Sequence, residues 1–200
     1  TDADTDADTD ADTDTDTDAD TDADTDADTD ADTDVVAGTV NEVMAANTGV
    51  VLDESDNPSD WIELYNAGSS EVDLTGYGIS DDWTAPDQHA LPEGTTIAAG
   101  GHLLLWASGK TKTGSSHLPF RLDASGEGVG LFTPDGDAVD WKVYPSLDDD
   151  TAFARIPDGG EDWQEVILGT PGDVNRVLAL ETIEVVSEQS TWSFWDTGEE

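Results

Sequence analysis

The sequence predicts an all-β protein built as a two-sheet sandwich. From residue 35 onward, short runs of residues either alternate between apolar and polar or are continuously apolar, and Gly, Pro, Asn and Asp clusters separate them. No window keeps helical periodicity for longer than a turn or two. About seven to nine short strands, separated by frequent turns, are typical of two packed antiparallel sheets.

The first strands show the alternation expected of a sheet with one covered face. In residues 60–66, Ile62 and Leu64 share one face, while Glu63 points to the other and is expected to be solvated. Residues 102–107 are continuously apolar after the first position. That composition favours a central strand covered on both sides.

The later strands are separated by strong turn signals. Residues 129–132 and 138–144 flank the sequence Thr-Pro-Asp-Gly-Asp, in which Pro presets its φ angle and Gly accepts a positive one, so the segment predicts a hairpin. Two further short strands are expected at residues 153–156 and 163–167.

The first 34 residues are a Thr/Ala-Asp repeat with Asp at every even position and no basic residue. Such a segment has almost nothing to bury and many like charges to separate, so we predict a disordered, extended acidic tether over residues 1–34. Its Asp-x-Asp spacing lacks the Gly and the bidentate Glu of an EF-hand loop, so it favours weak cation condensation over a defined calcium site.

The charge and composition exclude several classes of function. Beyond the tether the chain still has 31 acidic residues against six basic ones, which disfavours binding to nucleic acid or to an anionic membrane surface. Without cysteine there is no disulfide, zinc-thiolate site or thiol nucleophile. No apolar run approaches the roughly 20 residues that a membrane-spanning helix needs.

An ordered series of short motifs carries a family resemblance over about residues 36–175. The series comprises Asn41-Glu42-Val43-Met44-Ala45-Ala46-Asn47, Asp60-Trp61-Ile62-Glu63-Leu64-Tyr65-Asn66, Val72-Asp73-Leu74-Thr75-Gly76-Tyr77, Ile79-Ser80-Asp81, Leu91-Pro92-Glu93-Gly94-Thr95, Ile97-Ala98-Ala99-Gly100-Gly101, Phe120-Arg121-Leu122-Asp123-Ala124-Ser125-Gly126-Glu127, Arg155-Ile156-Pro157-Asp158-Gly159 and Thr170-Pro171-Gly172. In this order the motifs resemble the lamin tail domain in its bacterial and archaeal form.

The resemblance implies an immunoglobulin-like sandwich over residues 35–175 and no active site. Similar microbial domains occur in exported multidomain proteins, beside hydrolases or other β modules. We therefore assign no catalytic residue and no organic cofactor. A glycoside-hydrolase carboxylate pair or a nucleophilic Ser115 or Ser116 beside His117 lacks the convergent groups that such chemistry requires.

One acidic loop is a candidate calcium site. It offers hard oxygen ligands from Asp53, Glu54, Asp56, Asn57 and Asp60. The alternative, which we favour, is a solvent-facing acidic loop, because acidity runs through the whole chain and the spacing matches no calcium motif.

Tryptophans and histidines supply the remaining candidates. Trp83 lies in a polar loop, so it is the candidate ligand-facing aromatic for a carbohydrate or protein partner, whereas core packing is favoured for Trp106 and Trp141. The three histidines, His89, His102 and His117, match no zinc-ligand spacing and are expected at the surface or at strand edges.

These observations favour a non-catalytic adhesion or scaffolding module, extracellular or anchored at the cell surface, that binds a protein or carbohydrate. The alternative is a domain that positions a larger secreted hydrolase, of nuclease or phosphatase type, on its substrate. Residues 176–200 read as a linker followed by the start of a second β module. Since the chain begins with Thr and its only Met is Met44, we expect flanking domains and a targeting signal in a longer chain.

Overall fold

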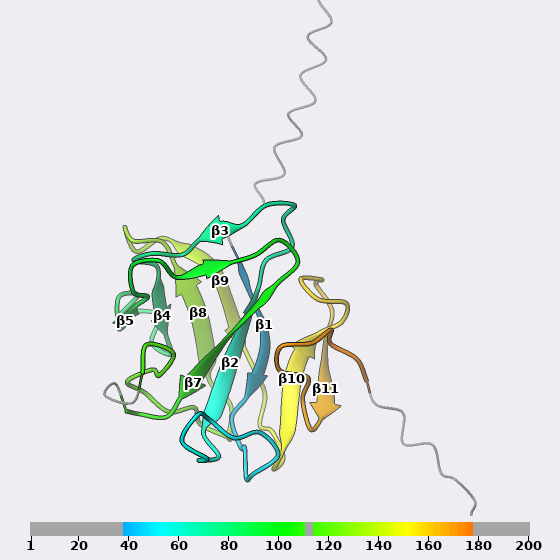
Figure 1. The fold of residues 1–200 in the computed structure, drawn as a ribbon. Coiled ribbons are helices and arrows are strands. Elements are labelled where there is room, and N and C mark those ends of the chain that lie inside the picture. The colour runs from blue at the N-terminus through cyan, green and yellow to red at the C-terminus, as the bar shows by residue number, and fades with distance from the viewer. Residues whose placement is uncertain (1–37, 111–113, 178–200) are drawn as a thin grey trace, which may run out of the picture. The chain divides into compact units, whose positions relative to one another are not determined.

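The computed structural model describes residues 38–110 and 114–177, and within these ranges every regular element is a β-strand (Figure 1). The tether predicted for residues 1–34 and the second module expected within 178–200 lie outside the described residues. The strands are β1 (Thr39–Met44), β2 (Asp60–Tyr65), β3 (Val72–Asp73), β4 (Gly78–Ser80), β5 (His89–Ala90), β6 (Thr96–Ile97), β7 (His102–Ala107), β8 (Gly128–Phe132), β9 (Ala138–Val143), β10 (Thr151–Arg155) and β11 (Trp163–Ile167).

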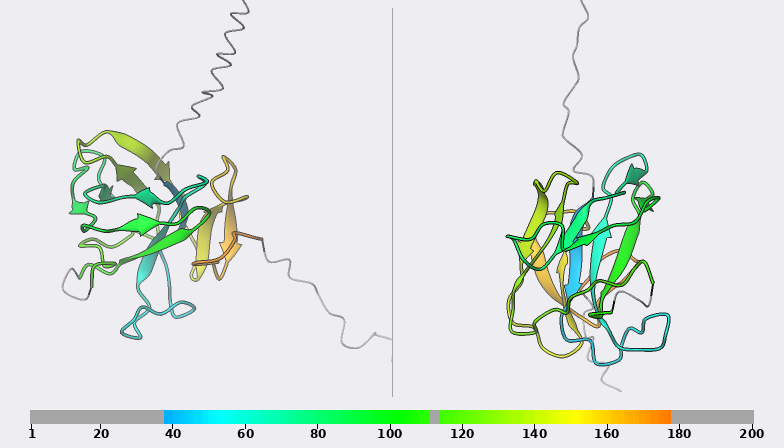
Figure 2. Two further views of the ribbon diagram at one scale, coloured as in Figure 1. Left: turned by 45° about the horizontal axis from the view of Figure 1, so that its top comes forward. Right: turned by 90° about the vertical axis from the view of Figure 1, so that its left-hand side faces the viewer.

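Two sheets face each other across the hydrophobic core (Figure 2). The first is five-stranded, in the order β11-β10-β1-β2-β7, and the second is four-stranded, in the order β5-β4-β8-β9, while β3 and β6 form a short separate ribbon. All the strand pairs are antiparallel. The predicted sandwich is therefore confirmed.

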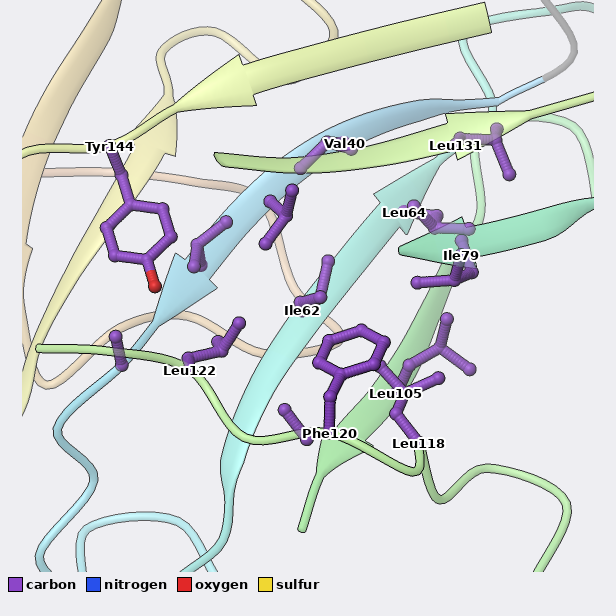
Figure 3. Packing of buried hydrophobic residues seen from close by; sticks show 14 of the residues in the cluster. Val40, Ile62, Leu64, Ile79, Leu105, Leu118, Phe120, Leu122, Leu131 and Tyr144 are labelled. Atoms are coloured by element: carbon purple, nitrogen blue, oxygen red, sulfur yellow. The ribbon is translucent and has the colours of Figure 1, made fainter. Parts of the chain in front are cut away.

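The core forms because each sheet presents one apolar face to the other. Ile62 of β2 and Leu105 of β7 come from the five-stranded sheet, while Ile79 of β4 and Leu131 of β8 come from the four-stranded sheet (Figure 3). All four side chains are almost fully buried. The period-two alternation of a strand places Ile62 and Leu64 on this face, as the sequence predicts.

Strand β7 departs from its predicted place in the middle of a sheet. It is an edge strand, paired on one side with β2. Its other side meets the loop before Leu118: the Trp106 amide donates to the Ser116 carbonyl, and the Leu118 amide donates to the Trp106 carbonyl. The strand is continuously apolar because both of its faces are covered, and that composition does not distinguish an edge from a centre.

The outer face of the five-stranded sheet is covered as well. Met44, Trp61, Trp106 and Ala152 form a second buried cluster on this face. Residues 168–177, here called the C-terminal strap, run across it. Gly169 of the strap has φ +63°, and a Cβ there would lie 2.8 Å from the Trp61 ring, so glycine allows the close approach of the strap.

Truncation of Leu131 tests the core. Leu131 is 0% exposed, so Leu131→Ala should lower the free energy of unfolding by about 2–5 kcal/mol through lost burial and an unfilled cavity. Chemical denaturation of the full chain measures this change. Val143→Ala is the control, because Val143 is 63% exposed and its truncation should change the free energy by no more than about 0.5 kcal/mol. Equal effects of the two substitutions would contradict the assigned core.

Candidate functional site

A polar loop lies over the outer face of the four-stranded sheet. It spans residues 81–88 and is fixed to Ser80 at the end of β4, whose hydroxyl donates to Gln88 Oε1 at 2.8 Å and accepts the Asp82 amide at 2.9 Å. Gly78 permits this arrangement, since a Cβ there would lie 2.0 Å from the Pro86 carbonyl oxygen. The loop thereby brings Trp83 above the sheet.

Trp141 of β9 lies flat against the same outer face. On the neighbouring strand, Gly128 and Gly130 alternate with the buried Val129 and Leu131 and so face outward. A Cβ on Gly128 would come within 2.1 Å of the Trp141 ring, and one on Gly130 within 2.5 Å. The two glycines thus make the space that the indole occupies.

Trp83, Phe132 and Trp141 together form what we call the aromatic patch. The Trp83 ring stands edge-on to Trp141, with centroids 5.3 Å apart and planes at 84°, and lies 5.8 Å from Phe132. Phe132 is buried beneath, whereas Trp83 is 56% exposed. Trp83 is therefore exposed as a ligand-facing residue must be. Trp141 is only half-buried and lies outside the core, because its strand position faces away from the opposite sheet.

A cavity of about 240 Å³ is lined by the segments that neighbour the aromatic patch in the sequence, although Trp83, Phe132 and Trp141 are not in its lining. It lies between the loop that carries Trp83 and the β8–β9 turn, which begins directly after Phe132. Its lining comprises Gly76, Gly78, Pro86, Asp87, Ala90, Thr133, Pro134, Asp135 and Gly136. The patch and the cavity together give an exposed apolar surface and a recess with carboxylates at its wall.

In the candidate calcium loop, three of the carboxylates already have hydrogen-bond partners within the protein. The buried Asp53 carboxylate accepts the amides of Ser55 and Asn57 at 2.9 Å each, and these hydrogen bonds hold its pKa at about 2 despite burial. Glu54 binds His117, and Asp60 accepts the Asn47 amide at 3.1 Å.

The other two candidate ligands differ in exposure. Asp56 is exposed, whereas Asn57 is half-buried and its side-chain amide donates to Asp53 Oδ1 at 3.1 Å. Within the ranges that the structure describes, no group of three His, Asp or Glu side chains is placed to hold a metal ion. Calcium binding at this loop, the alternative that the sequence disfavours, stays untested.

The expectation of a solvated Glu63 is wrong. Glu63 and Glu42 are directly opposed on β1 and β2, and both are 0% exposed beneath the C-terminal strap. The Thr170 amide donates to Glu42 at 3.1 Å, and the Gly172 amide donates to Glu63. The alternation did place Glu63 on the outer face, but a segment more than a hundred residues later covers that face.

Burial determines the ionisation of this pair. Burial, followed by the neighbouring Glu63 carboxylate, raises the pKa of Glu42 to about 8, and burial also raises the pKa of Glu63. The Thr170 hydroxyl has one hydrogen, and Asn175 Oδ1 is its nearest acceptor at 2.7 Å. The Thr170 oxygen is then free to accept a proton held on Glu42, which lies 3.3–3.4 Å away.

The histidine prediction is correct at the strand edges and wrong for His117. His89 and His102 lie on the edge strands β5 and β7, and burial lowers the pKa of His89. His117 is 0% exposed, with its Nδ1 atom 2.8 Å from the Ser108 hydroxyl and its Nε2 atom 2.8 Å from Glu54. These contacts span nine and 63 residues of sequence, so spacing gave no signal of them.

The Ser108–His117–Glu54 chain has the residue types of a hydrolytic triad without access for a substrate. Ser108 is 3% exposed, and its oxygen also accepts the Lys110 amide at 3.2 Å. A nucleophile must reach an electrophilic carbon of a substrate, and the buried Ser108 hydroxyl cannot. Its hydrogen bonds instead connect the end of β7 to His117 and to the Lys110 amide.

Comparison with known proteins identifies a domain family. The family model described as Lamin Tail Domain matches residues 39–146, which is more than half of the chain. The match includes β1 to β9 and the whole aromatic patch, while β10, β11 and the strap follow it. A search of curated proteins finds no match to this chain. No helix among the described residues is long and apolar enough to cross a membrane.

The raised pKa of Glu42 makes stability depend on pH in a defined direction. A carboxyl whose pKa rises from 4.5 to about 8 on folding stabilises the protonated fold, so its contribution is full below pH 4.5 and is lost as the pH rises through 8. Between pH 6 and pH 9 the native chain should lose roughly 2 to 3 kcal/mol through this group. Glu42→Gln mimics the protonated form and should remove that loss.

Urea denaturation at both pH values measures the effect. Glu165→Gln on the exposed face of β11 removes the same charge without burial and should leave the native pH dependence in place. An unchanged pH dependence in Glu42→Gln would show that Glu42 is ionised in the fold at neutral pH.

Proposed function

The chain belongs to the lamin tail domain family, and from that premise we propose that it is a non-catalytic interaction module, used in adhesion or scaffolding, that binds its partner through the aromatic patch. The family is one of immunoglobulin-like domains without catalytic activity. We therefore propose that the domain acts by binding a partner, and that one of its surfaces recognises that partner.

The exposure of Trp83 is the observation that supports this surface. Of the large apolar side chains that are exposed on the described residues, Trp83 is the single aromatic one, at 56%. Tryptophan is enriched among the residues that dominate binding energy, because a rigid side chain buries a large area at small entropic cost. Trp83 is also backed by Phe132 and Trp141, so it is held in place before a partner arrives.

The location of the module is the second part of the proposal. A net charge of −42 and an Asp-rich segment of 34 residues suit a tether that holds a binding domain away from a surface. We place the module outside the cell or on the cell surface, as a bacterial or archaeal type of the family.

Substitution of Trp83 tests the proposed face. The full chain, immobilised on a sensor, is probed with a panel of purified surface proteins, polysaccharides and synthetic polypeptides. Trp83→Ala should weaken binding to whichever panel member is recognised by at least tenfold while the domain stays folded, because Trp83 is 56% exposed and lies outside the core. Ile167→Ala is the matched control, since Ile167 is also an exposed apolar residue, at 47%, on β11 of the other sheet.

Each outcome separates the alternatives. Loss of binding in Trp83→Ala alone supports the aromatic patch as the binding face. Equal binding by both variants and the native chain would contradict it. Recognition restricted to the polymeric substrate of a hydrolase would favour the domain that positions an enzyme on its substrate.

A further inference from the structure

We propose that the aromatic patch and the neighbouring cavity bind the cationic side chain of an arginine or lysine on a protein partner. The inference rests on the proposed function and names the class of partner for the same face. Three features carry it: the geometry of the rings, the hydrogen-bonding chemistry of the cavity, and the local charge.

The rings present a surface suited to a cation. The Trp83 and Trp141 rings stand nearly perpendicular, at 84°, and Trp83 keeps 56% of its surface exposed beside Trp141. A guanidinium or ammonium group over an indole face is attracted by the ring quadrupole. The chain uses this contact elsewhere, with Lys142 Nζ 4.5 Å and the Arg155 guanidinium carbon 4.8 Å from the Trp163 ring centroid. Within the described ranges, no such internal cation lies over Trp83.

The cavity wall includes two carboxylate residues, Asp87 and Asp135, and some of its backbone amides are missing or already engaged. Pro86 and Pro134 have no amide hydrogen. The Gly76 amide donates to the Leu91 carbonyl at 2.9 Å, and the Gly136 amide donates to the Thr133 carbonyl at 2.9 Å, so both are engaged. A guanidinium or ammonium group only donates hydrogen bonds, so carboxylate and carbonyl oxygens such as those of Asp87 and Asp135 are the partners it requires.

The carboxylates at the cavity are uncompensated. Asp87 and Asp135 line it, and neither takes part in an ion pair within the part of the chain that the structure describes. Asp81 and Asp82 immediately precede Trp83. The segments that build the site, residues 76–90 and 128–141, contain no Lys or Arg. A cation is therefore attracted both by the local carboxylates and by the net charge of the chain.

The size of the cavity fits one side chain. Its volume of about 240 Å³ is below the roughly 300–1,000 Å³ of typical small-molecule pockets. A single arginine or lysine from a protein surface would place its charged end among the carboxylates and its aliphatic stem along the aromatic patch.

A pair of probes matched in shape but different in charge tests the inference. N-acetylarginine amide and N-acetylcitrulline amide have nearly the same shape, but only the first is charged. Each is titrated into the full chain while the indole N–H resonance of Trp83, assigned by its loss in Trp83→Ala, is followed by NMR. We expect the arginine probe to shift this resonance with at least tenfold higher affinity than the citrulline probe.

Variants separate the cavity from the general negative charge. The double variant Asp87→Asn, Asp135→Asn should weaken arginine binding at Trp83 at least fivefold. The double variant Asp148→Asn, Asp149→Asn is the control that removes the same two charges, because both residues are exposed in the β9–β10 connection, and it should leave binding within twofold of native. Equal weakening by this control would overturn the cavity as the cation site.

The outcomes also distinguish the cationic partner from the more general proposal that the aromatic patch binds a partner. Equal affinity for arginine and citrulline at Trp83 would overturn the cationic partner and leave the aromatic patch as the binding face. No shift with the arginine probe, together with a saccharide or neutral protein bound through Trp83, would do the same. Binding of a panel member that is insensitive to Trp83→Ala would overturn both.

Discussion

The fold depends on hydrogen bonds between the C-terminal strap and two buried carboxyl groups in the middle of the five-stranded sheet. Glu42 and Glu63 accept amides from Thr170 and Gly172, so strands near the start of the domain are joined to a segment at its end. Asn175 adds two more hydrogen bonds, to the carbonyls of Asn41 and Arg155. Without the strap, these acidic groups and the tryptophans beside them would face solvent. The strap therefore gives the sheet its second buried face.

The outer faces of the two sheets both carry large aromatic side chains, and these are covered in different ways. On the five-stranded sheet, the chain covers the outer face with its own backbone, and the tryptophans there are buried at 0% and 7% exposure. On the four-stranded sheet, outward glycines in β8 leave room for Trp141, and one loop brings Trp83 across it. That cover is incomplete, because Trp83 stays mostly exposed. An aromatic side chain that is held in place but not covered is what distinguishes a binding surface from an ordinary sheet face.

Sequence reasoning predicted what depends on near neighbours in the chain. Alternation predicted the inward face of β2, and the Pro-Asp-Gly turn predicted the β8–β9 hairpin. It could not predict what covers an outward face. Glu63 was placed correctly on its strand and wrongly in solvent, since its cover comes from Gly172. His117 is buried by contacts with Glu54 and Trp106, which no local spacing encodes. Trp83 was identified because a tryptophan among polar loop residues is itself a local signal.

The protein has few basic residues, and none in the segments that build the aromatic patch neutralises the carboxylates there. Arg155 is engaged by Asp140 at 2.9 Å and by the Val40 carbonyl at 2.8 Å, and Lys142 lies over Phe153 and Trp163. Both cations thus serve the junction between β9 and the β10–β11 pair. The carboxylates around Trp83 receive no such compensation from the segments that build the site. Two of the six basic residues are thus used in the junction between β9 and the β10–β11 pair, and the negative potential around Trp83 is what the proposed cationic partner would meet.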